Sequence, residues 1–418
     1  MRVPMSTATH GHAAAQVVRG VGGGRLTPRR AAATLGAIAF AYAVVMAGTT
    51  LPTSLYPALQ RAFGLSTAAS TQLFAIYAVT VLAGLIAFGS ISDRVGRRPV
   101  LYLGLSAAIA SGILYATASS IPLLFVARAM SGVSAALVTG TATAFLVDSA
   151  SRPRLGASVA SAANMLGLGL GPILAAVVAA RFPEQVVSAP FVVHAGLSAI
   201  ACLALLAAAE RPRRLHRRRF EILLPAVPRS ALPRFLRASA ASVGFVIMGA
   251  CTAISAILLT AVNGRPDIIV VGAVGSTIFL ATAAGQLVGA RSGARWRELG
   301  FLAIVLGLVG IGSAALVPPS LSIAVLVGGL SLAGVGHGVL FPRALALTIA
   351  DVAPDRRARA SAAYWCVAYA FTAVGAVAVG GLCALWGERT GVPVYAGAML
   401  VVSTAAGIAT RGLRAEAG

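Results

Sequence analysis

Twelve long apolar stretches constrain the fold of this chain more than any other feature of its sequence. A helix needs about 20 apolar residues to cross the hydrocarbon core of a bilayer, and each stretch is about that long or longer. Polar or Pro/Gly-rich breaks separate them. We therefore predict an all-α integral membrane protein with about 12 transmembrane helices. The predicted spans are residues 32–57, 69–90, 99–118, 121–147, 155–180, 189–208, 238–262, 268–290, 299–317, 320–349, 359–384 and 391–410.

The composition agrees with a membrane protein and excludes two other classes. Of the 418 residues, 58% are hydrophobic and 11% are charged, which is more apolar surface than a soluble core of this length can bury. A net charge of +22 raises the question of nucleic acid, but the basic residues are spread over many loops instead of forming one patch. We expect the lipid bilayer as a partner and no nucleic acid.

The distribution of arginine predicts the orientation in the membrane. All 33 basic residues are arginines. With the N-terminus in the cytoplasm, 27 of them fall in cytoplasmic segments and four on the opposite side, with two more inside predicted helices. Positively charged loops resist translocation. We therefore expect a multi-pass protein of the cytoplasmic (inner) membrane with both termini in the cytoplasm.

The chain divides into two related halves. A charged, proline-containing segment at residues 209–237 reads as a cytoplasmic linker between them. The segment from Asp148 to Ala160 can be laid over the segment from Asp351 to Ala363 at a constant offset of 203 residues. The predicted divisions are a disordered basic tail at 1–31, a six-helix bundle at 32–208, the linker, a second six-helix bundle at 238–411 and a short tail at 412–418.

One loop carries a family resemblance. Between the second and third apolar stretches the chain reads Gly89-Ser-Ile-Ser-Asp93-Arg94-Val-Gly96-Arg97-Arg98. This resembles the signature loop between helices 2 and 3 of the major facilitator superfamily of secondary transporters, with every signature position filled. The resemblance implies two pseudo-symmetric six-helix bundles that rock about a site at the middle of the membrane.

The resemblance also implies that this loop belongs to a latch between the halves. In the family, the position of Asp93 faces a helix N-terminus in the opposite bundle, here near Arg357–Ser361. The position of Arg97 pairs with an acid at the end of helix 4, here Asp148. The alternative is that these charges only fix the topology. The predicted latch residues are Gly89, Asp93, Arg94, Gly96, Arg97, Arg98 and Asp148.

Two further helices resemble family motifs. Arg128 lies in a stretch that resembles the helix 4 motif, in which a buried arginine is linked to proton coupling. The alternative is an arginine that snorkels to the outer surface. Gly167, Gly171 and Pro172 resemble the helix 5 antiporter motif of drug-efflux members, although alanines replace its last two glycines. This motif favours export.

The site residues must come from few ionisable groups. All 11 acidic residues lie at predicted helix ends or in loops, and residues 32–50 lack the helix 1 acid that many proton-coupled multidrug members carry. Arg128, His194, His337 and Arg343 remain inside predicted helices. His337 is a candidate proton carrier, with a neutral histidine bonded to a helix carbonyl as the alternative. Arg343 could meet a substrate anion or a carbonyl freed by Pro342. Further polar or aromatic candidates are Tyr42, Gln72, Tyr77, Asn164, Tyr364, Trp365 and Tyr369.

Taken together, the residues and the resemblance predict a transporter. We expect proton-coupled efflux of a small neutral or anionic amphiphile, such as a drug or secondary metabolite, by a functional monomer. An importer or facilitator of a small metabolite is the alternative. An intramembrane enzyme would need paired acids or a nucleophile arrangement, and none is visible. The four cysteines lack metal-ligand spacing, so we expect no metal site, no disulfide and no cofactor.

The orientation can be tested with reporter fusions. A reporter enzyme that is active only in the cytoplasm should be active when fused directly after Arg98. The same reporter fused in the break at residues 182–188 should be inactive, because that break lies on the opposite side. The reverse pattern would contradict the predicted topology.

Overall fold

The architecture is entirely helical in the part of the chain that the structure describes. The computed structural model describes residues 28–88, 91–150, 152–206, 225–264, 266–353 and 356–411. Within these ranges there are 12 helices long and apolar enough to cross a membrane. This confirms the predicted all-α membrane fold. The tail at 1–27, most of the predicted linker and residues 412–418 lie outside the described residues.

The two halves of the chain each contribute six long helices and a few short ones. Those of the first half are α1 (Pro28–Thr50), η1 (Leu51–Leu55), α2 (Tyr56–Phe63), α3 (Thr67–Phe88), α4 (Ser92–Val95), α5 (Arg97–Ala116), α6 (Ile121–Ser149), α7 (Pro153–Arg181), η2 (Pro183–Gln185) and α8 (Ala189–Leu206). Those of the second half are α9 (Leu232–Ala240), α10 (Val243–Asn263), α11 (Ile268–Arg291), η3 (Gly293–Arg295), α12 (Trp296–Ser313), α13 (Pro319–Ile349), α14 (Arg357–Trp386) and α15 (Glu388–Ala409).

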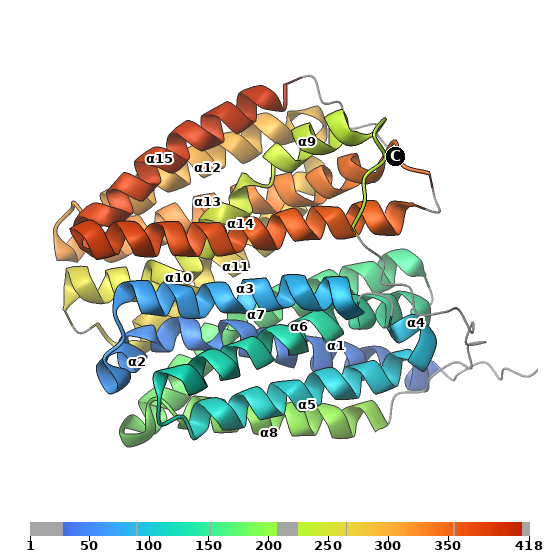
Figure 1. The fold of residues 1–418 in the computed structure, drawn as a ribbon, viewed down its shortest axis with the longest axis horizontal. Helices are drawn as coiled ribbons and strands as arrows, with labels where there is room; N and C mark the ends of the chain where they lie inside the picture. The colour runs from blue at the N-terminus through green and yellow to red at the C-terminus, as the bar shows by residue number, and fades with distance from the viewer. Residues whose placement is uncertain are drawn as a thin grey trace, which may run out of the picture.

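The halves lie side by side with their long helices roughly aligned (Figure 1). Helices α1 to α8 form one group and α9 to α15 the other, and the groups meet where α3 lies against α14 and α7 against α11. The short helix α4 lies at one end of the molecule and α2 at the other (Figure 1). We call these the α4 end and the α2 end.

The first span is longer than the sequence indicates. A helical backbone continues from Pro28 to Phe63, beyond the predicted end at residue 57, by passing through the 3₁₀ turn η1. Pro52 and Pro57 stand at the second positions of η1 and α2, within the first turn of each, where a proline is tolerated because the first N–H groups of a helix have no helical partner. Gly64 then ends α2 in a left-handed conformation with a φ of 67°.

A hydrogen bond between helices repairs the backbone of α7 at its internal proline. Pro172 has no N–H, so the carbonyl of Leu168 loses its helical partner inside the membrane, where an unpaired polar group is costly. The hydroxyl of Thr50 on α1 donates to this carbonyl at 2.8 Å. Ser54 donates to the Pro172 carbonyl at 3.1 Å. The proline thereby fixes α7 against α1.

Small residues let α7 approach helices on both of its sides. A Cβ at Gly167 or Gly171 would overlap the backbone of α1, at the carbonyls of Ala43 and Ala47 respectively. On the other side, a Cβ at Gly272 of α11 would lie 2.7 Å from the Pro172 carbonyl oxygen. Glycines at these positions let the helix backbones approach closely. Such close packing is typical of membrane helices, which associate without a hydrophobic driving force. The helix 5 motif therefore lies where three helices from both halves meet.

Close contacts also join the halves toward the α2 end. Thr67, at the start of α3, donates a hydrogen bond of 2.5 Å to the carboxylate of Glu388, at the start of α15. A Cβ at Gly380 of α14 would overlap the side chain of Thr71 on α3. These contacts hold the two halves together at the α2 end.

The internal repeat extends to a pair of arginine caps at the α4 end. Arg98, at the start of α5, donates to the carbonyl of Leu205 in the last turn of α8 at 2.6 Å. Arg297, at the start of α12, donates to the carbonyl of Thr410 after α15 at 2.5 Å. The last carbonyls of a helix have no helical partner, and a guanidinium satisfies both their hydrogen bonding and their partial charge. Each half therefore secures its last helix in the same way.

A short helix begins inside the predicted linker. Helix α9 starts at Leu232, six residues before the predicted span, and buries Phe235 and Ala238 against the second half. The Arg234 guanidinium lies 2.7 Å from the Asp351 carboxylate at the end of α13. This part of the linker is therefore attached to the second half.

The contact between α7 and α1 can be tested with two glycine substitutions. Gly171→Ala should destabilise the protein by about 1–3 kcal/mol, because the added methyl group collides with the Ala47 carbonyl. Gly140→Ala on α6 is the matched control, since no atom lies within 4 Å of a Cβ built there. Thermal unfolding in detergent should show a lower midpoint for the first variant only. Equal midpoints would contradict the packing described here.

Candidate functional site

A cavity lies between the two halves, midway along the long helices. Its volume is about 100 Å³. The first half lines it with Met46, Thr49, Thr50, Phe74, Tyr77, Thr139, Asn164, Met165 and Leu168. The second half lines it with Phe245, Met248, Thr252, Phe279, His337, Phe341, Trp365, Tyr369 and Thr372. A concave, mostly apolar space with a few polar groups is typical of a small-molecule site.

The second half presents a group of ring side chains to the cavity, which we call the aromatic wall: Phe245, His337, Phe341, Trp365 and Tyr369. His337 and Phe341 are nearly parallel, with ring centroids 5.8 Å apart and 11° between the planes. Phe245 meets the edge of His337 at 4.5 Å, and Trp365 lies 5.4 Å from Phe341. These separations are those of favourable ring contacts. The rings support one another and form a continuous surface.

The first half is more polar where it faces the cavity. Thr49 and Thr50 come from α1, Thr139 from α6 and Asn164 from α7. The residues that line the cavity, all within the described part of the chain, include no aspartate or glutamate. The cavity therefore offers neutral hydrogen-bonding groups and ring faces to a ligand.

Arg128 lies directly behind this polar face. Its side chain is 0% exposed, and its guanidinium donates a hydrogen bond of 2.6 Å to the carbonyl of Thr49. The guanidinium carbon also lies 4.5 Å from the ring centroid of Tyr77 and 5.4 Å from that of Phe74. Cation–π contacts of this kind stabilise a desolvated charge. The arginine points into the bundle and does not snorkel to the surface.

His337 forms part of the cavity surface and is only 3% exposed. A Cβ at Gly244 of α10 would overlap its Nδ1 atom, so the absence of a side chain at Gly244 makes room for the ring. Nδ1 has no hydrogen-bond partner within the described residues. The alternative in which this nitrogen binds a helix carbonyl is therefore not observed.

A family comparison agrees with this geometry. The family model described as the Major Facilitator Superfamily matches residues 38–265, which is more than half of the chain. The chain belongs to the major facilitator superfamily. Transporters of this superfamily share the fold described above.

Individual relatives are more distant. The multidrug efflux pump LfrA of Mycolicibacterium smegmatis is 29% identical over 151 residues, which cover 35% of this chain. The chain spans only 30% of that pump's length in this match.

Solved transporters show the same fold. A bacterial homolog of the human lysosomal transporter Spinster, in an inward-facing and unoccupied conformation, is similar with a TM-score of 0.75 and 16% identity, over 92% of this chain and 98% of the other. A variant of the nucleoside transporter NupG is similar with a TM-score of 0.72 and 13% identity, over 90% and 99% of the two chains.

The ion pair that the resemblance implied is present in this superfamily member. The Arg97 guanidinium lies 2.7 Å from the Asp148 carboxylate, at the α4 end. The side chain of Arg97 is 10% exposed and that of Asp148 is 42% exposed. Gly96, just before α5, has a φ of 93°, which favours glycine at this turn. Arg94 lies in α4 beside this turn.

Other predicted latch residues stay as predictions. Gly89 and the side chain of Asp93 lie outside the described part of the structure. Asp148 and Asp351 are equivalent in the repeat, yet they bind different partners, since Asp351 pairs with Arg234 of α9. The repeat therefore preserves the acid but changes the arginine that neutralises it.

Arg343 is not placed with the cavity residues. It lies nearer the α4 end of α13, where it donates to the carbonyl of Gly289 at 3.2 Å. The expectation that it lies deep in the helix and meets a substrate anion is not supported by this position. Its hydrogen bond does go to a backbone carbonyl, as the second sequence interpretation allowed, but that carbonyl belongs to α11 and not to its own proline-containing helix.

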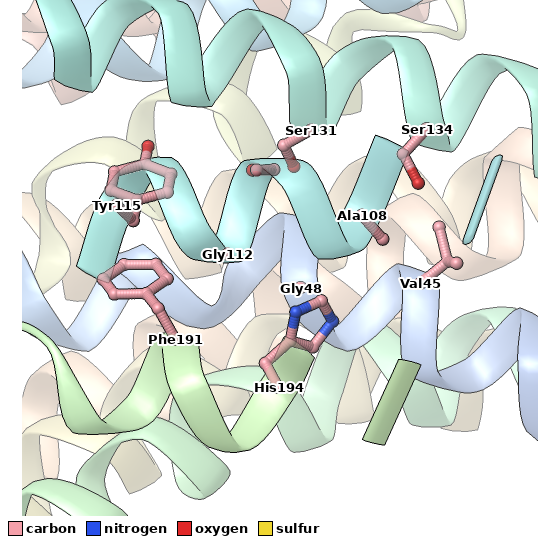
Figure 2. A pocket seen from close by; sticks show the side chains of 10 residues that line it. Val45, Gly48, Ala108, Gly112, Tyr115, Ser131, Ser134, Phe191 and His194 are labelled. Atoms are coloured by element: carbon pink, nitrogen blue, oxygen red, sulfur yellow. The ribbon is translucent and has the colours of Figure 1, made fainter. Parts of the chain in front are cut away.

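His194 occupies a separate, smaller cavity within the first half (Figure 2). Its Nε2 atom lies 2.9 Å from the Val44 carbonyl oxygen, and its ring lies against Gly48. Figure 2 shows Ser131 and Ser134 across this space from the imidazole. The volume of about 10 Å³ corresponds to a single water molecule. His194 therefore packs within one bundle, away from the cavity between the halves.

Sequence reasoning found part of the cavity and missed the rest. Of the further candidates, Tyr77, Asn164, Trp365 and Tyr369 line it, whereas Tyr42, Gln72 and Tyr364 do not. Phe245, Phe341 and the five threonines were missed. Spacing of four residues was the available signal, since it places His337 with Phe341, and Trp365 with Tyr369, on one helix face.

The ion pair at the α4 end can be tested by a double-mutant cycle. Arg97→Gln and Asp148→Asn should each lower stability, and the double variant should lose less than the sum, because the pair interacts directly. The coupling energy should be about 0.2–1 kcal/mol, since Asp148 is partly exposed. Chemical or thermal unfolding in detergent measures it. A coupling energy of zero would show that the two side chains do not stabilise each other directly.

Proposed function

We propose that this transporter exports a small neutral or anionic amphiphile in exchange for protons, by alternating access. The observation that carries the proposal is the cavity between the halves, which combines an aromatic wall with neutral polar groups and an arginine behind its polar face. We propose further that it works in the cytoplasmic membrane with both termini in the cytoplasm, as the arginine distribution indicates.

The charge of the cavity argues against cationic substrates. A desolvated cation is stabilised best by a negative partner, and the described lining contains no carboxylate, so only cation–π contacts with the aromatic wall would offset its desolvation. Arg128 lies behind Tyr77 and Phe74, so the nearest buried charge is positive. A neutral or anionic molecule avoids both costs.

Two observations favour export. Gly167, Gly171 and Pro172 resemble the helix 5 motif of exporters, and they lie where α7 meets α1 and α11. A drug efflux pump is also among the similar proteins. Import or facilitated passage of a metabolite is the second candidate, since a nucleoside transporter has the same fold.

The contacts at the two ends suggest how access alternates. We propose that residues 32–208 and 238–411 move as two bodies. At the α2 end, the bond between Thr67 and Glu388 must break before the cavity opens there. At the α4 end, the proposed latch includes Arg97 and its partner Asp148; it keeps this end closed and therefore favours the state that is open at the α2 end. Each state is then stabilised by contacts that the other state lacks.

Proton coupling would involve the ionisable groups at the cavity. His337 lies on its surface and Arg128 lies behind it. Protonation of the imidazole would place a positive charge on the cavity surface of the second half, and this would change the balance between the two states. These residues are therefore our candidates for coupling the proton to transport.

Transport in everted membrane vesicles tests substrate charge and coupling together. A neutral aromatic antibiotic should accumulate when the vesicle interior is acidic, whereas a lipophilic quaternary ammonium dye should not. His337→Ala and Arg128→Ala should abolish the dependence on the pH gradient. Arg343→Gln is the matched control and should retain it, because Arg343 binds Gly289 outside the cavity.

The opposite results are equally clear. Strong accumulation of the dye would refute the proposed substrate charge. Accumulation that is the same with and without the gradient would remove proton coupling, and accumulation only in right-side-out vesicles would indicate an importer.

A further inference from the structure

The threonines that line the cavity donate their hydroxyl protons to backbone carbonyls. Five threonines line it, three from the first half and two from the second: Thr49, Thr50, Thr139, Thr252 and Thr372. Each donates its O–H to a backbone carbonyl. The accepting carbonyls belong to Met46, Leu168, Ala135, Met248 and Ala368, at distances of 2.7, 2.8, 2.7, 2.7 and 2.9 Å respectively.

This arrangement determines which hydrogen bonds a ligand can make with these threonines. A hydroxyl group has one proton and two lone pairs, so an oxygen whose proton is bound to a carbonyl can only accept. The threonines therefore present acceptor oxygens to the cavity. A ligand that contacts them must supply N–H or O–H groups.

The aromatic wall restricts the shape of the ligand. Trp365 lies 5.4 Å from Phe341, and Phe341 stacks 5.8 Å from His337 at an angle of 11°. A surface built of ring faces and edges gains most from another flat ring system. Saturated or globular molecules of equal size would contact fewer of these rings.

The same observations favour a neutral ligand over a charged one. An ammonium group has suitable donors but would lack a carboxylate among the described lining residues. A carboxylate ligand needs donors, and the five threonine hydroxyls provide none, so it would depend on the few donor groups of Asn164, Trp365 and Tyr369.

We propose that the cavity binds a neutral, flat aromatic molecule that carries several hydroxyl groups, as a polyphenol does. The inference rests on the proposed role of this cavity as the substrate site and narrows the substrate to one class. It does not depend on the direction of transport or on its coupling.

Binding to the purified full-length protein in detergent tests this class directly. Three compounds of one scaffold are compared: an unsubstituted flavone, its polyhydroxylated form and the corresponding polymethoxy ether. The hydroxylated form should bind at least about tenfold more tightly than either of the others, because only it supplies donors. Quenching of intrinsic fluorescence or calorimetry gives the dissociation constants.

Isosteric variants locate the effect. Thr252→Val and Thr372→Val should each reduce the preference for the hydroxylated compound by about three- to tenfold, which is the range of one hydrogen bond. Thr260→Val is the matched control, because Thr260 lies on the same helix as Thr252 and donates to Ala256 at 2.9 Å but lines a different cavity. Trp365→Leu should weaken binding of all three compounds and leave their ratio unchanged.

The outcomes separate this inference from the proposed function. Equal affinities for the hydroxylated and methoxylated compounds would overturn it, as would an equal loss of preference in Thr260→Val. A preserved preference without uptake into everted vesicles would instead support the inference and refute export.

Discussion

The structure depends on the rule that every backbone polar group inside a membrane must find a partner within the protein. On α7, Pro172 leaves the Leu168 carbonyl without its helical partner, and the hydroxyl of Thr50 on α1 donates a hydrogen bond to that carbonyl instead. Both Thr50 and Leu168 also line the cavity between the halves. The same hydrogen bond therefore pairs the free carbonyl of α7 and places a polar group at the edge of the cavity.

The same rule explains the ends of the helices. Arg98 and Arg297 bind the last carbonyls of α8 and α15, so the two halves carry equivalent caps. The acids at the ends of α6 and α13 are also equivalent, but Asp148 binds Arg97 whereas Asp351 binds Arg234. The first pair involves the signature loop and the second involves the segment that connects the halves. The two halves thus share the arginine caps but differ in the arginine that pairs with the acid: it comes from α5 in the first half and from α9 in the second.

The sequence predicts the fold well because length and hydropathy alone identify twelve spans. It predicts the pair of Arg97 with Asp148 because the family resemblance links the arginine of the loop to an acid at the end of helix 4. The cavity is harder to predict for a physical reason. Most of these helices are apolar all round, so no periodic polar face shows which residues point inward. Phe245 and Thr139 line the same cavity only because the two bundles meet there. On α13, His337 lines the cavity whereas Arg343, six residues further on, binds the Gly289 carbonyl. Only the three-dimensional packing distinguishes these positions.

The cavity also shows how a transporter can be polar and selective without an acid at its centre. A threonine that donates to its own helix satisfies its proton at little cost, yet leaves lone pairs for a ligand. If one carboxylate bound both proton and substrate, the two would compete directly. In this cavity the described lining has no carboxylate, so under the proposed coupling the proton would bind His337 and would act on the substrate through the balance between the two conformations as well as through its charge. We propose that the same balance also depends on contacts far from the cavity, between Thr67 and Glu388 across the halves and between Arg97 and Asp148 within the first half, so that a proton at the cavity and these distant contacts act on one equilibrium.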